Sequence, residues 1–525
     1  MTRTLKVNTG IRARRTSDAA EPLVLLDARS TQPLYRQLYD GLRQAIIGGR
    51  LRPGARLPAA RALGNDLSLS RNTVEQAYEQ LHAEGYLDRH SRRGTFVSLT
   101  TPEQTLDAPL ALHPRGRAVC RTLTPSPPRR VLSARGRAIA SIGLPAGVNT
   151  SDPPRAFRPG VPALDAFPMS VWARLSARHW RRASRRHLAY GHSAGYQPLR
   201  EAIAQHLAAA RGVRCTADQV IVVGGSQQAL ALATRLLLDP GDPVWMEEPG
   251  YVGARAAFVA SEATMVPVPV DDDGLDVDAG ERLAPHARLA FVTPSHQHPL
   301  GAAMSVRRRL ALLDWARRAD AWILEDDYDS EIRYEGRPLP AMQGLDDDGR
   351  VIYIGTFSKT VFPALRLGYV VVPPSLVDAF VTARLIVDRH SSVLEQAILT
   401  DFIAEGHYAR HVRRMRTLYA ERQNVLVEML GPFGDVLDVQ PARAGLNLLA
   451  WLPAGIDDRE IAMAAHHAGV EAPPLSPFAQ LPLSRGALIL NFSGYDAFAI
   501  RTTAARLGAV VRDTVARKSP RALGA

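Results

Sequence analysis

The sequence predicts an α/β protein built of two unlike parts, a small helical domain with a β-hairpin and then a large α/β domain. Short apolar runs alternate with helical patterns from residue 157 onward, which is typical of a largely parallel sheet. Three helix-like segments and a hairpin-like segment precede them. The positive charge is concentrated in the first part, because residues 1–160 hold 25 basic and 12 acidic residues while the whole chain carries +12.

Length and composition limit the class of protein. A chain of 525 residues exceeds the size at which one core usually stops growing. It contains no apolar run long enough for a membrane helix, and residues 1–16 lack the apolar region of a secretory signal. Two cysteines, Cys120 and Cys215, cannot form a disulfide framework. We therefore expect a cytoplasmic protein without a membrane partner.

Composition also divides the chain into four segments. We expect a mobile arm at 1–28, a basic helical domain with a hairpin at 29–98, a linker at 99–154 and the α/β domain at 155–525. The linker holds nine prolines and seven arginines, which predicts a stiff, extended and disordered connector. Its arginines either add non-specific DNA affinity or make no contacts.

Helical periodicity predicts three helices between residues 33 and 83. Leu34, Leu38 and Leu42 share the apolar face of the first helix, and Pro58 begins the second. A short turn leads to Ser70, a favourable N-cap for the third helix. Two helices joined by so short a turn match a helix-turn-helix.

Polar residues follow that N-cap, and arginines lie at the tip of the hairpin at 86–97. Arg can bind guanine and Asn can bind adenine in a bidentate manner, whereas the hairpin arginines are suited to phosphates, as in a wing. The residues expected to contact DNA are Arg61, Ser70, Arg71, Asn72, Thr73, Gln76, Arg89, Arg92 and Arg93.

The segment LRPGARLPAARALGNDLSLSRNTVEQAYEQLHAEGYL, residues 51–87, resembles the winged helix-turn-helix of the GntR regulators. The resemblance implies double-stranded operator DNA as a partner. Ala59 and Ala60 stand where that family usually has hydroxyl residues, so we expect one phosphate contact to be missing.

Four polar clusters follow the strand-like runs of the large domain, at 224–230, 247–251, 322–328 and 354–359. Ligands bind beyond the carboxyl ends of strands in such sheets, so we expect the clusters to form one site. The five runs that predict strands are 219–223, 243–246, 288–292, 321–324 and 351–354.

Lys359 is the most informative residue in these clusters. Of the 64 basic residues 61 are Arg, and the other lysines are Lys6 and Lys518. An amine can lose its proton when desolvated and form a Schiff base with an aldehyde, which a guanidinium does not do. Lys359 therefore indicates a site for pyridoxal 5′-phosphate (PLP).

A PLP site assigns a role to each cluster. Asp326 would face the pyridine nitrogen, with Glu325 and Asp327 as rival carboxylates. Tyr328 lies two residues further along the strand and could donate to the ring 3′-oxygen. Tyr251 would cover the ring. The phosphate would be held by Ser226, Gln227, Ser358 and Arg366.

Residues from about 157 to 515 resemble a fold-type I aminotransferase domain, through YGHSAGYQPLREAIAQHL, ILEDDYDSEIRY and GTFSKTVFPALRLGYV. Joined to a GntR-type winged helix, this domain resembles the arrangement of the MocR regulators. The resemblance implies a PLP-responsive transcription factor that forms a homodimer through this domain. It also implies that Tyr190 reaches the cofactor phosphate of the partner subunit.

The alternative is an aminotransferase with an appended DNA-binding domain. Enzymes of this fold usually bind the substrate carboxylate with an Arg where this chain has Ile489, and an aliphatic side chain cannot replace a guanidinium. Arg443 or Arg485 could substitute. His298 stands where the enzymes carry Asn, so the 3′-oxygen of the cofactor would lose one hydrogen-bond partner. His296 or Gln297 could take the place of that Asn.

The effector stays open at this point. It is either PLP itself, which would link the protein to vitamin B6 synthesis, or an amine or amino acid that displaces Lys359 as an external aldimine. Nothing in the sequence pattern indicates a metal site, since His296 and His298 have no further ligands nearby in the sequence.

Overall fold

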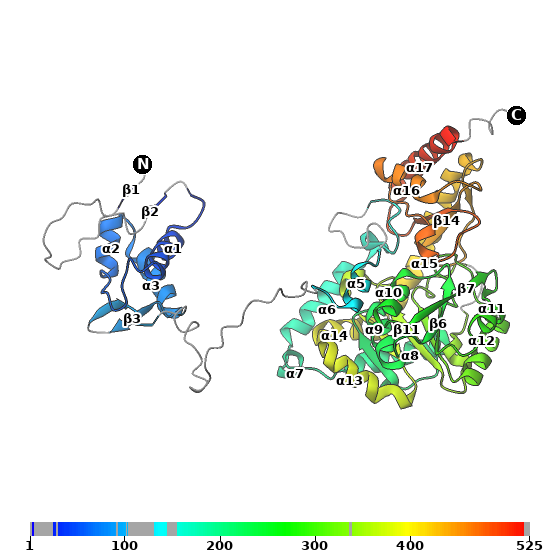
Figure 1. Cartoon of the computed structure of the whole chain (residues 1–525), viewed down its shortest axis with the longest axis horizontal. Helices are drawn as coiled ribbons and strands as arrows, with labels where there is room; N and C mark the ends of the chain where they lie inside the picture. Colours follow the sequence, from blue (N-terminus) through cyan, green and yellow to red (C-terminus); the bar gives the residue numbers. More distant parts are fainter. Residues whose placement is uncertain are drawn as a thin grey trace, which may run out of the picture. The chain divides into compact units, whose positions relative to one another are not determined.

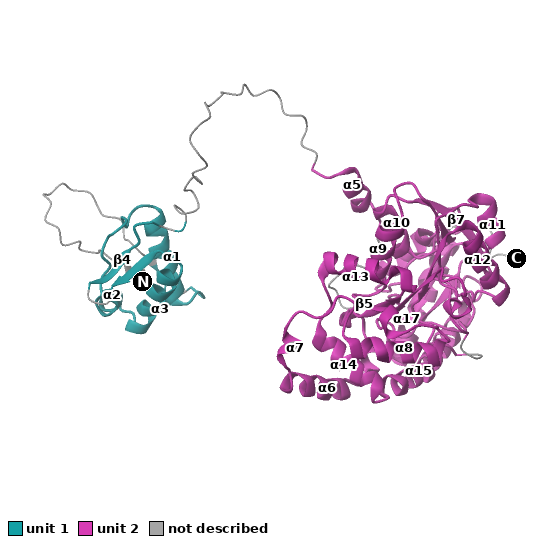
Figure 2. Ribbon diagram, turned by 90° about the horizontal axis from the view of Figure 1, so that it is seen from below, with its two compact units in different colours: residues 1–127 teal, residues 128–525 magenta. Residues whose placement is uncertain are grey.

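The computed structural model describes residues 3–4, 25–27, 30–90, 93–100, 102, 131–143, 155–334 and 339–518. Most of the predicted arm and linker, and Arg92, lie outside these residues. The chain divides into two compact units, Met1–Pro127 and Pro128–Ala525 (Figure 2). No helix of the described residues has the length and apolar character needed to cross a membrane.

Three helices and a hairpin make up the first unit. They are α1 (Leu34–Ile47), α2 (Ala60–Leu67), α3 (Arg71–Ala83), β3 (Leu87–His90) and β4 (Gly94–Val97), with the paired strands β1 (Arg3–Thr4) and β2 (Leu25–Leu26). The apolar face predicted for the helices forms the core, where Leu38, Val74 and Leu81 are fully buried. The hairpin pairs antiparallel, with Leu87 opposite Val97.

The turn between α2 and α3 has the geometry of a helix-turn-helix. Ser68 ends α2 in the left-handed conformation, at φ 57°. Ser70 then caps α3, because its hydroxyl oxygen accepts a hydrogen bond from the backbone N–H of Thr73 at 3.1 Å. The predicted N-cap is therefore present in the structure.

An eight-stranded sheet forms the centre of the second unit (Figure 1). Its order is β5-β12-β11-β10-β9-β6-β7-β8, and β8 and β12 run in the opposite direction to the other strands of this sheet. The strands are β5 (Val220–Val223), β6 (Pro243–Glu248), β7 (Thr264–Asp271), β8 (Gly274–Leu275), β9 (Leu289–Val292), β10 (Trp322–Asp327), β11 (Val351–Thr356) and β12 (Gly368–Val371).

Helices cover both faces of this sheet because its strands are buried on both sides. Val220 and Val222 belong to a cluster with α6, α8 and α14, whereas Ile221 and Val223 pack with α9, α10 and α13. The helices of this unit are α5 (Ala134–Ala140), α6 (Met169–Arg181), α7 (Arg185–Leu188), α8 (Gln197–Arg211), α9 (Ser226–Leu237), α10 (Val252–Ala260), α11 (Val277–Leu283), α12 (Val306–Ala319), α13 (Val377–Asp388), α14 (Val393–Ala404), α15 (His407–Leu430), α16 (Asp458–His467) and α17 (Ala497–Lys518).

A second, smaller sheet lies near the carboxyl terminus. It consists of β13 (Asp438–Val439), β14 (Asn447–Trp451) and β15 (Ala487–Asn491), all antiparallel. Side chains of α15, α16 and α17 pack with it in one apolar cluster, and Figure 1 shows these elements together. This sheet supplies one wall of the site described below.

The secondary structure differs from the sequence-based prediction in two respects. The strands β7 and β12 and the small sheet were not predicted. The segment predicted to be an extended linker contains α5, which Ser133 caps by accepting from the N–H of Gly136 at 2.9 Å. This helix packs on α10, with an ion pair between Arg135 and Glu262 at 3.2 Å, and tertiary contact explains why composition alone did not reveal it.

Candidate cofactor site and DNA-binding surface

The carboxyl ends of β5, β6, β9, β10 and β11 open into a cavity of about 810 Å³. The four predicted polar clusters all contribute to it. The predicted residues that line it are Ser226, Gln227, Tyr251, Asp326, Tyr328, Ser358, Lys359 and Arg366. Residues that the sequence analysis did not single out also line it, among them Arg158, Gly160, Thr293 and Asn447.

Lys359 follows β11 and projects into this cavity. Its Nζ donates a hydrogen bond to the carbonyl oxygen of Gly160 at 3.1 Å. Desolvation lowers the pKa of the Lys359 amine, although Asp329 and Asp326 act in the opposite direction. A lowered pKa increases the share of the unprotonated amine, which is the nucleophilic form.

Of the three carboxylates on β10, only Asp326 lines the cavity. Glu325 accepts from the backbone N–H groups of Met342 and Gln343 at 2.8 and 2.9 Å. Asp327 pairs with Arg211 at 2.8 Å. Glu325 is therefore bound by the backbone. Asp327 is bound through Oδ2, although its buried Oδ1 also has no hydrogen-bond partner among the described residues. The position in the cavity wall distinguishes Asp326 from both.

Asp326 itself has a buried oxygen, Oδ1, with no hydrogen-bond partner among the described residues. Burial, and after it the nearby Asp327, raises the pKa of the carboxyl group to about 8. A buried polar atom without a partner costs free energy, so this carboxyl group needs a ligand. A pyridine nitrogen matches that need, and the residues present fit PLP.

Tyr328 and two histidines form the next part of the wall. The hydroxyl of Tyr328 lies 3.0 Å from Nδ1 of His296, which also contacts Asp329 at 3.1 Å. Burial lowers the pKa of His298 to about 3, so its ring is neutral at physiological pH. Gln297 does not compensate for the Asn of the enzymes, because its amide donates to Glu247 and to backbone carbonyls.

The amino end of α9 provides a cradle for an anion. Gly225 precedes this helix at φ 118°, and a Cβ placed there would lie 3.3 Å from a guanidinium nitrogen of Arg366. Ser358 adds a hydroxyl, which accepts a hydrogen bond from Thr356 at 3.0 Å. Helix N–H groups, hydroxyls and a guanidinium together suit a phosphate.

Two predicted tyrosines lie in different places. Tyr251 lies directly before α10 and lines the cavity, and burial raises its pKa to about 12. Tyr190 does not line the cavity of its own chain. It is 80% exposed and lies under Arg389, 4.6 Å from the ring centroid to the guanidinium carbon.

The position that would hold a substrate carboxylate is aliphatic in the structure. Ile489 lies on β15, is 1% exposed and packs with Val252 and Phe478. Arg485 pairs with Asp438 at 3.1 Å instead of entering the cavity, and Arg443 is exposed and not among the lining residues. Neither arginine replaces the missing guanidinium.

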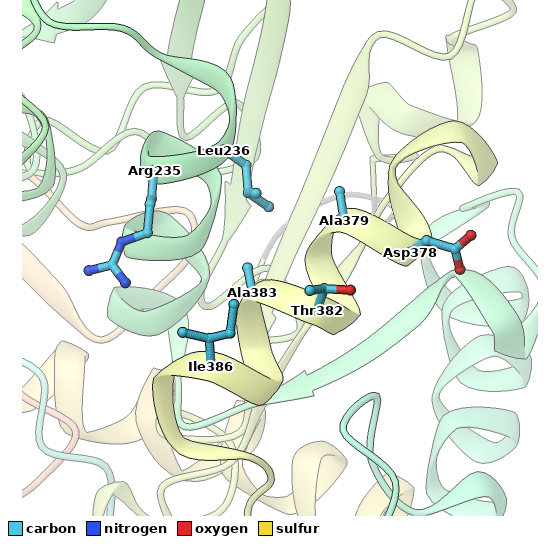
Figure 3. A pocket seen from close by; sticks show the side chains of 7 residues that line it. All are labelled: Arg235, Leu236, Asp378, Ala379, Thr382, Ala383 and Ile386. Atoms are coloured by element: carbon cyan, nitrogen blue, oxygen red, sulfur yellow. The ribbon is translucent and has the colours of Figure 1, made fainter.

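A second groove of about 450 Å³ lies between α9 and α13 (Figure 3). Arg235 and Leu236 line it from α9, and Ile386 is among the residues that line it from α13. It shares no residue with the cofactor cavity.

In the described residues no cluster of three or more His, Cys, Asp or Glu side chains could hold a metal ion.

The predicted DNA-contacting residues lie on the surface of the first unit. Arg61, Arg71, Asn72 and Gln76 are exposed on α2 and α3, as are Ser70 before α3 and Arg89 and Arg93 in the hairpin, while Thr73 is half-buried. Arg71 pairs with Glu75 at 3.2 Å. Arg92 lies outside the described residues.

Comparison with known proteins agrees with this division. The family "Bacterial regulatory proteins, gntR family" matches residues 34–97, and "Aminotransferase class I and II" matches residues 160–460. The chain is similar to the "Probable rhizopine catabolism regulatory protein MocR" of Rhizobium meliloti, with 45% identity over 90% of this chain and 93% of the relative. It is 31% identical to the "HTH-type pyridoxine biosynthesis transcriptional regulator PdxR" of Corynebacterium glutamicum, over 81% of this chain and 84% of the relative.

A solved structure supports the fold of the second unit. The multiple substrate aminotransferase from Thermococcus profundus matches with a TM-score of 0.66 and 29% identity, covering 74% of this chain and 98% of that one. The predicted fold class is thus confirmed. The chain belongs to the MocR-type regulators of the GntR family, transcriptional regulators that join a helix-turn-helix domain to an aminotransferase-like domain.

Proposed function

We propose that this regulator binds PLP through Lys359 and that the state of this site controls how the helix-turn-helix domain binds operator DNA. The observation that carries the proposal is that Lys359 and Asp326 line the same cavity, and that Oδ1 of Asp326 has no hydrogen-bond partner among the described residues. PLP supplies an aldehyde that forms a Schiff base with primary amines. A ligand of this site can shift DNA binding only through different affinities for two arrangements of the protein.

Each side chain of the cavity has a role in holding the cofactor. Asp326 would bind the protonated pyridine nitrogen, Tyr328 the 3′-oxygen, and Tyr251 the ring face. The phosphate would lie in the cradle of Ser226, Gln227, Ser358 and Arg366. This assignment leaves no predicted cavity residue without a function.

The regulator acts as a homodimer through its second unit in this proposal. Tyr190 is largely exposed in a single chain, so it is available to reach the phosphate of the partner subunit. A dimer presents two helix-turn-helix domains to operator DNA, so we expect the operator to contain paired half-sites.

Relatives support two kinds of effector. The relative from Corynebacterium glutamicum is named for pyridoxine biosynthesis, and the one from Rhizobium meliloti for rhizopine catabolism. The effector here is either PLP itself, with vitamin B6 synthesis as the controlled process, or an amino compound that competes with Lys359.

An aminotransferase is the second candidate, favoured by a lysine whose pKa is lowered. Ile489 opposes it, because a carboxylate substrate would meet an aliphatic side chain where enzymes use a guanidinium. We therefore expect little or no turnover of ordinary amino acids.

Footprinting on DNA beside the protein's own gene, with and without PLP, tests the proposal. We expect protection that changes with PLP, or with PLP plus an amine. Identical protection under all three conditions would overturn control by this site. Lys359→Ala and Lys359→Arg should both lose the visible absorption of bound PLP, since neither can form a Schiff base; retention of that absorption would overturn the cofactor assignment.

A further inference from the structure

One wall of the cofactor cavity is built from uncharged side chains. The loop after Phe157 contributes Val161, and Leu446 lies directly before the small carboxyl-terminal sheet. Helix α10 contributes Val252 and Ala256. Pro473 and Phe478 complete this wall. Ligands that enter beside Lys359 therefore meet a mostly apolar surface.

Each cationic side chain that lines the cavity, among the described residues, already lies beside another group of the protein. Arg366 lies at the amino end of α9, beside Gly225. Lys359 contacts the Gly160 carbonyl. Arg158 pairs with Glu471 at 2.7 Å, and both side chains are largely buried, at 14% and 8% exposure. The charge of Arg158 is thus balanced within the protein.

The polar group of this wall is an amide. The side-chain amide oxygen of Asn447, Oδ1, accepts a hydrogen bond from the side-chain amide of Asn491, Nδ2, at 3.2 Å. That contact orients the Asn447 NH₂ group as the donor left for a ligand. Ile489 lies two residues before Asn491 on β15, and packs behind the wall against Val252 and Phe478.

We propose that the effector is a primary amine whose amine-bearing carbon carries no carboxylate, and whose remaining part is uncharged, with a hydroxyl or carbonyl oxygen for Asn447. The proposal rests on the proposed function, in which Lys359 holds PLP. An ionised carboxylate on this wall would lose its hydration without gaining a cation. An amine with an uncharged remainder does not meet that cost.

Matched ligand pairs test this inference with the full-length, PLP-loaded protein. 2-Aminoethanol and L-serine differ only in the carboxylate, as do 3-methylbutylamine and L-leucine. The readouts are the visible absorption of the bound cofactor and the affinity for operator DNA. We expect each amine to bind about tenfold or more tightly than its amino acid, because burial of an unpaired charge is costly.

The outcomes separate the two proposals. Absence of any cofactor absorption in the untreated protein would contradict the proposed function itself. Two outcomes, each with normal cofactor absorption, would overturn the effector class alone. In one, the amino acids bind as tightly as the amines or more tightly. In the other, none of the four compounds changes the absorption or the affinity for operator DNA.

Two variants make the test sharper. Glu471→Gln should improve the relative binding of L-serine, because it removes the carboxylate that balances the charge of Arg158. Ile489→Arg should do the same by adding a cation, and Ile489→Met is the uncharged control. An unchanged preference in Glu471→Gln, in a protein that still shows the cofactor absorption, counts against the role of this wall.

Discussion

Gly160 and Lys359 lie 199 residues apart in the chain, yet the Gly160 carbonyl oxygen is 3.1 Å from the Lys359 Nζ. Gly160 has a φ of 79°, and a Cβ added to it would lie 2.6 Å from that nitrogen. The absence of a side chain at position 160 is therefore a condition for the position of the amine.

Gly160→Ala should impair cofactor loading because the new methyl group displaces Lys359. We expect a fall of about tenfold or more in PLP affinity, measured by titration of the visible absorption. Gly455→Ala is the matched control, since Gly455 has a φ of 80° but nothing within 4 Å of the added Cβ. Both variants carry the same backbone strain, of about 1 kcal/mol, so equal cofactor affinity in the two would contradict the prediction.

Asp326 should make the cofactor-free protein less stable as the pH rises. The folded chain holds this proton up to a pKa of about 8, whereas the ordinary value is 3.8. The stability that goes with protonated Asp326 is thus complete below about pH 4 and is lost as the pH rises through about 8.

Asp326→Asn removes this dependence. In urea unfolding without PLP at about pH 8.5, the variant should be more stable than the wild type by at least about 1.4 kcal/mol, the equivalent of one pKa unit. The two proteins should converge at low pH. Asp513→Asn, an exposed change on α17, is the control; parallel pH curves for Asp326→Asn and wild type would show that Asp326 does not titrate in this range.

Asn72 and Arg93 should affect DNA binding in different ways. Asn72→Ala removes a side chain suited to a base edge, so we expect a loss of about 1–3 kcal/mol for the operator and little for unrelated DNA. Arg93→Ala should weaken binding to all sequences and reduce the salt slope by about 1. Titrations at several salt concentrations measure both effects.

Gln44→Ala on α1, another exposed change in the same unit, should leave DNA affinity unchanged. Loss of affinity for all sequences in Asn72→Ala would assign this residue to the phosphates.

Arg135→Glu should loosen α5 from α10 through repulsion with Glu262. Both partners are largely exposed, so we expect about 0.2–1 kcal/mol. Limited proteolysis near residue 140 should accelerate, and Arg135→Glu combined with Glu262→Arg should restore the wild-type rate. Failure of the double variant to restore protection would show that the ion pair does not hold this helix.

The period of a strand explains why the sequence located part of the site. Alternate residues share a face, so Asp326 and Tyr328 could be assigned together, and the structure brings both to the cavity. Arg158, Gly160 and Asn447 could not be found in this way, because they come from loops and a small sheet far away in the sequence. The tertiary fold alone brings them to Lys359.

The missed strands have a local cause. β7 contains Pro267 and Pro269, residues that disfavour a strand assignment, and β12 is only four residues long. The α/β class of the large domain was nevertheless predicted correctly. Its strands β5, β6, β9, β10 and β11 are buried on both faces, and so they appear in the sequence as continuous apolar runs.

The helix α5 and the cofactor cavity share a neighbour, α10. The helix α5 packs on α10, and its Arg135 pairs with Glu262, two residues beyond the end of α10. The same α10 contributes Val252, Gly253 and Ala256 to the wall of the cavity. A ligand that displaces α10 would therefore act directly on α5, the first described helix of the second unit.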